Sequence, residues 1–130
     1  MSLEYINRLG KERCERICQI VNNEVIMREA YLNGSFTGQL LCEQYGIDPR
    51  ELSAVMNLRF GESFSSLLRR LRVNKACRLL EAAAQATSPC EMIGFRCGFN
   101  SRQSFYGAFR KEKGLTPQEY RKKKLNNNNE

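Results

Sequence analysis

The chain has 130 residues, of which 42% are hydrophobic, 27% are charged and none is histidine, and its formal net charge is +7. This length and composition predict about one globular domain, and no apolar run approaches the ~20 residues of a membrane span. Because the chain lacks histidine, the commonest general base and metal ligand, we expect a protein that is not an enzyme and holds no metal or cofactor. No signal peptide is recognisable, so we expect a cytoplasmic protein.

Hydrophobic residues recur at helical spacing along almost the whole chain, which predicts an all-α fold of about seven helices. Residues 1–34 are predicted to form an N-terminal helical lead-in, with its apolar face between residues 11 and 31. A short helix is predicted over residues 37–44, because Thr37 can cap its start and Gly46 can end it.

The clearest helix start is the Asp-Pro-Arg-Glu sequence at residues 48–51, which has an N-cap residue, a proline at the first helical position and an acid two residues later. The helix should continue to about Leu58, so that residues 37–60 form a first helix-turn-helix unit. A long linker helix is predicted over residues 63–86, where apolar residues are spaced by three and four.

A second cap and proline pair, Ser88 and Pro89, begins the next predicted helix, which Gly98 ends, and Asn100 or Ser101 can cap the helix after it. This order of signals repeats the first one, with Gly98 lying 52 residues after Gly46. The repeat predicts a second helix-turn-helix unit over residues 88–113. A third cap and proline pair begins a terminal helix over residues 116–124, and residues 125–130 are expected to be a disordered tail.

The charge is distributed unevenly between the two halves of the chain. Residues 1–65 carry 7 basic and 9 acidic side chains, whereas residues 66–130 carry 14 basic and 5 acidic ones. A basic half indicates a polyanionic partner, either nucleic acid or an anionic membrane surface, although a solvated basic face has the same composition. Two helix-turn-helix units separated by a linker helix of about 30 Å favour double-stranded DNA, since their second helices could enter successive major grooves. The alternative is a non-catalytic helical module for protein interaction.

The cysteines lie mostly at apolar positions of the predicted helices and form no Cys-x-x-Cys pair. We therefore expect buried free thiols in a reducing compartment, rather than disulfides or a zinc site. The six residues are Cys14, Cys18, Cys42, Cys77, Cys90 and Cys97.

The second unit and the residues after it carry a specific motif. Its residues are Ile93, Gly94, Gly98, Phe99, Phe105, Phe109 and the run Gly-Leu-Thr-Pro-Gln-Glu-Tyr-Arg at 114–121. This motif resembles the signature of the AraC/XylS family of bacterial transcription regulators, and residues 61–80 resemble the linker-helix segment of that family. The resemblance covers about residues 31–121 and implies a double helix-turn-helix DNA-binding domain over residues 35–124.

The resemblance implies a sequence-specific transcription regulator that reads two adjacent major grooves with one recognition helix in each unit. RNA polymerase is a further partner to consider, and such domains are often joined to a sensor or dimerisation domain. Residues 1–30 are too short to form such a domain, so we expect either an output module of a longer regulator or a small stand-alone regulator.

The resemblance also implies which residues meet the bases. In the second unit, Arg102 and Gln103 are the favoured readers, because long donors near a helix start reach guanine or adenine edges. Glu51 is expected to serve the helix cap. Ala54 and Gly107 lie at family contact positions; the short Ala54 side chain reduces readout at its position, and Gly107 cannot contact a base. The expected base contacts are Arg50, Ser53, Asn57, Ser101, Arg102, Gln103 and Tyr106.

Phosphate contacts are expected from basic residues of the linker and of the second recognition helix. Arg72 either contacts phosphate or ties the linker helix to a neighbouring unit. The others either contact phosphate or belong to a solvated face. The expected phosphate contacts are Arg72, Arg110, Lys111 and Lys113.

Overall fold

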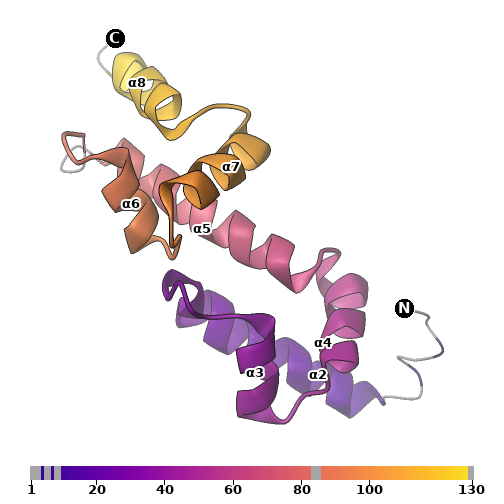
Figure 1. The fold of residues 1–130 in the computed structure, drawn as a ribbon. Helices are drawn as coiled ribbons and strands as arrows, with labels where there is room; N and C mark the ends of the chain where they lie inside the picture. Colours follow the sequence, from indigo (N-terminus) through magenta and orange to yellow (C-terminus); the bar gives the residue numbers. More distant parts are fainter. Residues whose placement is uncertain (1–3, 5–6, 8–9, 83–85, 129–130) are drawn as a thin grey trace. The chain divides into compact units, whose positions relative to one another are not determined.

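The computed structural model describes residues 4, 7, 10–82 and 86–128. The chain divides into two compact units, Met1–Tyr31 with Ser35–Leu68 and Leu32–Gly34 with Arg69–Glu130. Within the described ranges there are seven α-helices, α2 to α8, and no strand, which confirms the predicted all-α fold (Figure 1).

The first unit contains the first helix-turn-helix. Local bonds hold the helix over Gly38–Tyr45 at its start, where Thr37 Oγ1 accepts a hydrogen bond from the Leu40 N–H at 3.2 Å, and Gly46 ends the same helix with a φ of 65°. Only glycine adopts that left-handed backbone without a steric penalty. The elements of this unit are α2 (Lys11–Ile20), the π-helical segment Val21–Met27, the 3₁₀ turn Ala30–Leu32 except for its last residue, α3 (Gly38–Tyr45), α4 (Pro49–Val55) and the π-helical segment Met56–Phe60.

The α2 helix and the π-helical segment after it supply a continuous part of the first unit's core. Their buried side chains recur at spacings of three and four, so they lie along one face. The N-terminal segment, predicted as a lead-in, is therefore packed with the first helix-turn-helix. The buried residues are Cys14, Ile17, Cys18, Val21 and Val25.

The second unit contains α6 (Cys90–Arg96), α7 (Arg102–Lys113) and α8 (Pro117–Asn128), and α5 (Phe64–Glu81) continues into it from the first unit. Its core centres on three aromatic rings. The Phe105 ring centroid is 5.1 Å from that of Phe99 and 5.8 Å from that of Phe109. Each pair of this kind contributes about 0.5–1.5 kcal/mol beyond the area it buries.

Three helix boundaries differ from the predicted ones. The linker helix α5 ends at Glu81, before the predicted end at residue 86, and Ala82 lies in a bend. Residues 83–85 lie outside the described part of the chain. No side chain caps α6, whose preceding residue is Pro89, so the expected cap at Ser88 is absent. The terminal helix α8 extends to Asn128, so residues 125–128 are helical rather than disordered. No glycine or proline follows Pro117 to stop it.

Candidate nucleic-acid interface

The recognition helix of the first unit, α4, begins at a complete capping box. Asp48 Oδ1 accepts a hydrogen bond from the Arg50 N–H at 2.8 Å, and Glu51 Oε1 accepts one from the Asp48 N–H at 2.9 Å. Pro49 occupies the first helical position, where no N–H is needed. The sequence-based prediction of this helix start, and of Glu51 as part of the cap, is therefore confirmed.

Three of the predicted base readers lie on α4 and the π-helical segment that follows it. Arg50, Ser53 and Asn57 are all exposed, and their spacing of three and four places them on one helical face. The Arg50 side chain is 76% exposed and its Nε lies 3.6 Å from Asp48 Oδ1. Ala54 points the other way and is buried, at 1% exposure.

The α2 helix contributes a side chain to this helix start that sequence reasoning missed. Arg13 Nε lies 2.8 Å from Glu51 Oε2, and its Nη2 lies 3.0 Å from Glu51 Oε1 and 2.9 Å from the Gly46 carbonyl oxygen. Hydrogen bonding from Arg13 holds the pKa of Glu51 below its usual value. The partners are 38 residues apart in the chain, so no local pattern could have identified the pair.

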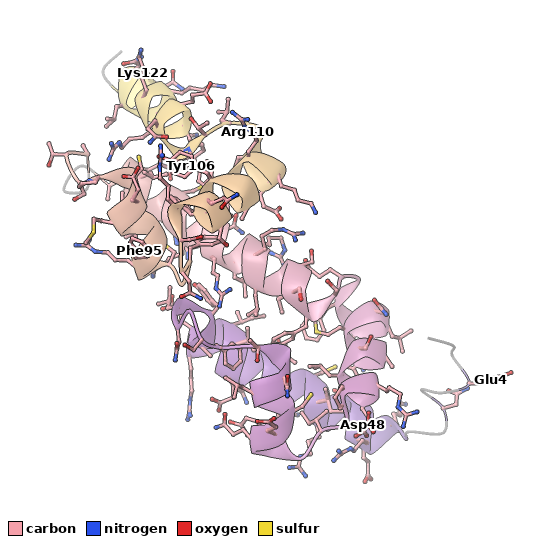
Figure 2. All side chains as sticks on the ribbon, viewed as in Figure 1. Glu4, Asp48, Phe95, Tyr106, Arg110 and Lys122 are labelled. Atoms are coloured by element: carbon pink, nitrogen blue, oxygen red, sulfur yellow. The ribbon has the colours of Figure 1, made fainter. Side chains whose placement is uncertain are left out.

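The second recognition helix, α7, begins at Ser101, whose Oγ accepts a hydrogen bond from the Ser104 N–H at 3.0 Å. Of the two caps that the sequence allowed, Ser101 is therefore the one used. The Asn100 side chain instead donates to the Gly34 carbonyl oxygen at 2.8 Å. Gly114, with a φ of 74°, ends the helix. Figure 2 shows Asp48 at the start of α4 and two residues along α7, Tyr106 and Arg110.

Two predicted readers of α7 are brought together around one carboxylate. Arg102 Nε lies 3.0 Å from Glu91 Oε1, and the guanidinium carbon lies 4.6 Å from the centroid of the Tyr106 ring. The Tyr106 hydroxyl donates to Glu91 Oε1 at 3.3 Å and accepts a hydrogen bond from Gln118. The Arg102 side chain is nevertheless 65% exposed, so it is both oriented and accessible.

The side chains beside this cluster are exposed. Gln103 lines a shallow concavity with Arg102 and Tyr106. Ser101 is exposed, and Gly107 is exposed with no atom within 4 Å of where a Cβ would lie. The second unit thus presents long polar side chains over the first turn of α7 and bare backbone one turn later.

The predicted phosphate contacts fall into two environments. Arg110, Lys111 and Lys113 are exposed in the last turn of α7. Glu112 lies among them, but its Oε1 is 2.8 Å from Arg69 Nε, so its charge is offset by an ion pair with α5. The surface of this helix end is consequently positive.

Arg72 differs from these three because it is only partly exposed. Its Nη2 donates to the Asn33 carbonyl oxygen at 3.2 Å, and burial lowers the pKa of its guanidinium. This hydrogen bond ties the linker helix to Asn33 within the same compact unit.

The cysteines take no part in this surface. All six are free thiols and buried, as predicted. Burial raises the pKa of Cys97 to about 12. Across the residues that the structure describes, no three His, Cys, Asp or Glu side chains gather in a way that could hold a metal ion. None of the helices in that part of the chain combines the length and apolar character of a membrane span.

Comparison with known proteins places this architecture in a family. Residues 41–123 match the family model described as a helix-turn-helix domain. The HTH-type transcriptional activator RhaR of Enterobacter sp. (strain 638) is 33% identical over 90 residues, which cover 69% of this chain and 31% of that protein. The chain thus spans about a third of the length of the curated relatives it matches.

Two solved structures have a similar fold. The C-terminal domain of AraT, a response regulator from Geobacillus stearothermophilus, has a TM-score of 0.71 at 27% identity and covers 89% of this chain and 88% of its own. The C-terminal domain of the two-component response regulator yesN from Fusobacterium nucleatum has a TM-score of 0.68 at 28% identity and covers 82% and 95%. The match to the AraT domain covers 89% of this chain, which is more than residues 41–130 make up. It therefore includes part of the segment before residue 41.

These matches define a class of protein, the helix-turn-helix transcription regulators, which is not a class of enzymes. Within it, the chain belongs to the AraC-type family of DNA-binding domains. The family resemblance expected from residues 93–121 is thereby confirmed, and the alternative of a protein-interaction module is not favoured.

Proposed function

We propose that this domain reads two adjacent major grooves of double-stranded DNA, with α4 of the first unit in one groove and α7 of the second unit in the next. The observation that carries the proposal is the surface of α7, where Arg102 is exposed and held in one orientation at the start of a capped helix. The α5 helix has 18 residues and is therefore about 27 Å long, comparable with the ~34 Å repeat of B-DNA.

In the second unit, Arg102 is the principal reader. An arginine can donate two hydrogen bonds to O6 and N7 of guanine, and a glutamine can pair in the same way with adenine. Gln103 is the reader beside it. Tyr106 and Glu91 hold the Arg102 side chain in place, so less conformational entropy is lost when DNA binds. Ser101 can still donate its O–H hydrogen, because its cap bond uses only the oxygen as acceptor.

In the first unit, Arg50, Ser53 and Asn57 are the proposed readers, and two of the three are short. We propose that α4 contributes less sequence discrimination than α7. Its backbone and capped start then mainly position the unit against the duplex.

The exposed basic end of α7 supplies the proposed phosphate contacts. Arg110, Lys111 and Lys113 lie together in its last turn, and the ion pair of Glu112 with Arg69 leaves their charge uncancelled. Arg72 is proposed as a weaker phosphate contact, because its guanidinium already donates to Asn33. Such contacts add affinity for every sequence and no discrimination.

We further propose that the chain works without catalysis in the cytoplasm, as the output module of a regulator. Two of the similar structures are described as C-terminal domains of response regulators. A sensor or dimerisation domain and RNA polymerase are the partners that such a module would serve.

Selection of bound duplexes from a randomised library tests this function. We expect two unequal sequence blocks about one helical turn apart, and an affinity for the selected duplex that falls linearly with the logarithm of the salt concentration. A protein-interaction module would show neither a selected sequence nor a salt-dependent affinity for DNA.

A further inference from the structure

Three neighbouring contacts join α2 to the turn of the first helix-turn-helix. One guanidinium, that of Arg13, donates to both carboxylate oxygens of Glu51 and to the carbonyl oxygen of Gly46. Glu51 belongs to the capping box of α4, and Gly46 is the residue that ends α3. Arg13 therefore bridges the two helices of the motif at the point where the recognition helix begins.

A second ion pair, in which α2 supplies the acidic partner instead of the basic one, holds the other end of the segment formed by α4 and Met56–Phe60. Glu15 Oε1 lies 2.6 Å from Arg59 Nη1, and Arg59 lies in the π-helical segment that continues α4. Between the two charged residues of α2, Cys14 is buried in the core, and its sulfur lies 3.9 Å from the same Arg59 nitrogen. We refer to Arg13 and Glu15, with their partners Glu51 and Arg59, as the α2 clamp.

The position of Glu51 connects the α2 clamp to the proposed DNA binding of α4. With the offset of 52 residues between the units, Glu51 occupies the place that the proposed reader Gln103 has in the second unit. The Glu51 side chain is only 13% exposed, and its charge lies in the first turn of the recognition helix. Without Arg13, this carboxylate would be left without its cationic partner at the start of the proposed DNA-reading helix, where it would repel phosphate.

We propose that Arg13 and Glu15 are positioning residues that set the first recognition helix for base reading, so that the specificity of the first unit depends on α2. Both residues lie outside the segment 41–123 that matches the family model. The inference rests on the proposed role of α4 in reading DNA. It predicts that damage to the clamp affects the first block of the bound sequence and spares the second.

The test uses the full chain and the randomised duplex library, with Arg13→Ala as the variant and Arg16→Ala as its matched control. Arg16 is an exposed arginine of the same helix, so both variants lose one positive charge and the same non-specific attraction to DNA. The block read by each unit is first assigned with the wild type, Asn57→Ala and Arg102→Ala.

We expect Arg13→Ala to lose sequence information in the block that Asn57→Ala affects, and to bind the wild-type duplex about tenfold more weakly than Arg16→Ala does. The block assigned by Arg102→Ala should keep its wild-type profile. Equal losses in both blocks would show a general loss of stability and would overturn the inference, as would a profile identical to that of Arg16→Ala.

Two further variants separate positioning from folding. Arg13→Lys keeps the charge but cannot make the paired contact, so we expect an intermediate loss in the first block with an unfolding temperature closer to the wild type. In Arg13→Ala/Glu51→Gln the stranded carboxylate is removed but the clamp stays absent, so we expect affinity for all duplexes to recover in part while the first block keeps the profile of Arg13→Ala. Failure of the affinity to recover, with the fold intact by circular dichroism, would contradict the role given to Glu51, and recovery of the first block would contradict the positioning role of Arg13.

The same data distinguish failure of the inference from failure of the proposed function. If the wild type selects no sequence at all, base reading itself is wrong. If the wild type selects two blocks and Arg13→Ala retains both, only the positioning role of α2 is wrong.

Discussion

The side chain of Arg102 shows how a single residue can be exposed and ordered at once. It stacks on Tyr106 and pairs with Glu91, and hydrogen bonding with Tyr106 raises the pKa of its guanidinium. Arg50, in the first unit, has the nearby carboxylate of Asp48 at the longer distance of 3.6 Å. The two proposed readers therefore differ in how far their orientation is set before DNA arrives.

This difference predicts the ranking of two substitutions. Arg102→Ala should cost about 1–3 kcal/mol on the preferred duplex and relax preference at one base pair, because a paired contact to one base is lost. Arg50→Ala should cost less. Specificity profiles of both variants on one randomised library measure the ranking, and it is wrong if Arg50→Ala removes more sequence information.

The thiols allow a second test at this scale. Because all six are buried and burial raises the pKa of Cys97 to about 12, we expect slow reaction with a disulfide reagent in the folded protein. The rate should rise sharply when denaturant unfolds the chain.

We also expect a chelator to leave the helical circular dichroism signal unchanged, since the spacing of the cysteines suits no zinc site. One zinc per chain by metal analysis would contradict this.

At the scale of the element, each recognition helix is built from local bonds at its start and core contacts along its length. The α7 helix has a serine cap, buried Phe105 and Phe109, and a left-handed glycine at its end. The residue with the lowest helix propensity in α7 is Gly107. It lies in the helix interior with no positive φ and with open space around it. A glycine there lowers helix stability without serving a turn.

Gly107→Ala should therefore stabilise the domain by about 0.5–1 kcal/mol, because alanine loses less backbone entropy in a helix than glycine. Thermal or denaturant unfolding measures this. Gly94→Ala is the matched control: its Cβ would lie 2.5 Å from a ring carbon of the buried Phe105, so it should destabilise the domain. A loss of stability in Gly107→Ala would show that the position has contacts other than those described.

At the scale of the whole molecule, the uneven charge matters more than any one basic residue. Residues 66–130 carry 14 basic and 5 acidic side chains, and one of those acids, Glu112, is paired with Arg69. A duplex held by such a surface is bound largely through release of counterions from its phosphates.

Removing one of the proposed phosphate contacts should therefore weaken binding to every duplex alike. For Lys111→Ala we expect a fall in affinity of similar size on selected and unselected sequences, and a salt slope smaller by up to ~1. Titrations of both duplexes at several salt concentrations test this. A loss confined to the selected sequence would instead identify Lys111 as a base reader.

Some of this molecule could be predicted because the relevant forces act between close neighbours in the chain. The capping box at Asp48 and Glu51 joins residues three apart, and the glycine turns depend on one residue each, so four-residue patterns identified them. The period of apolar residues predicted the all-α fold, since a helix buries one face at every third or fourth position.

The sequence alone thus determined the helices, their order as two units and the family to which the chain belongs. Only the tertiary structure decided which charged side chains meet: Arg13 with Glu51 across 38 residues, and Arg69 with Glu112 across 43. Such pairs depend on how helices pack, and an arginine on an exposed helical face has the same local sequence pattern whether or not a carboxylate lies opposite. For the same reason, only packing showed that Arg102 is held by Glu91 and that α2 reaches the first recognition helix.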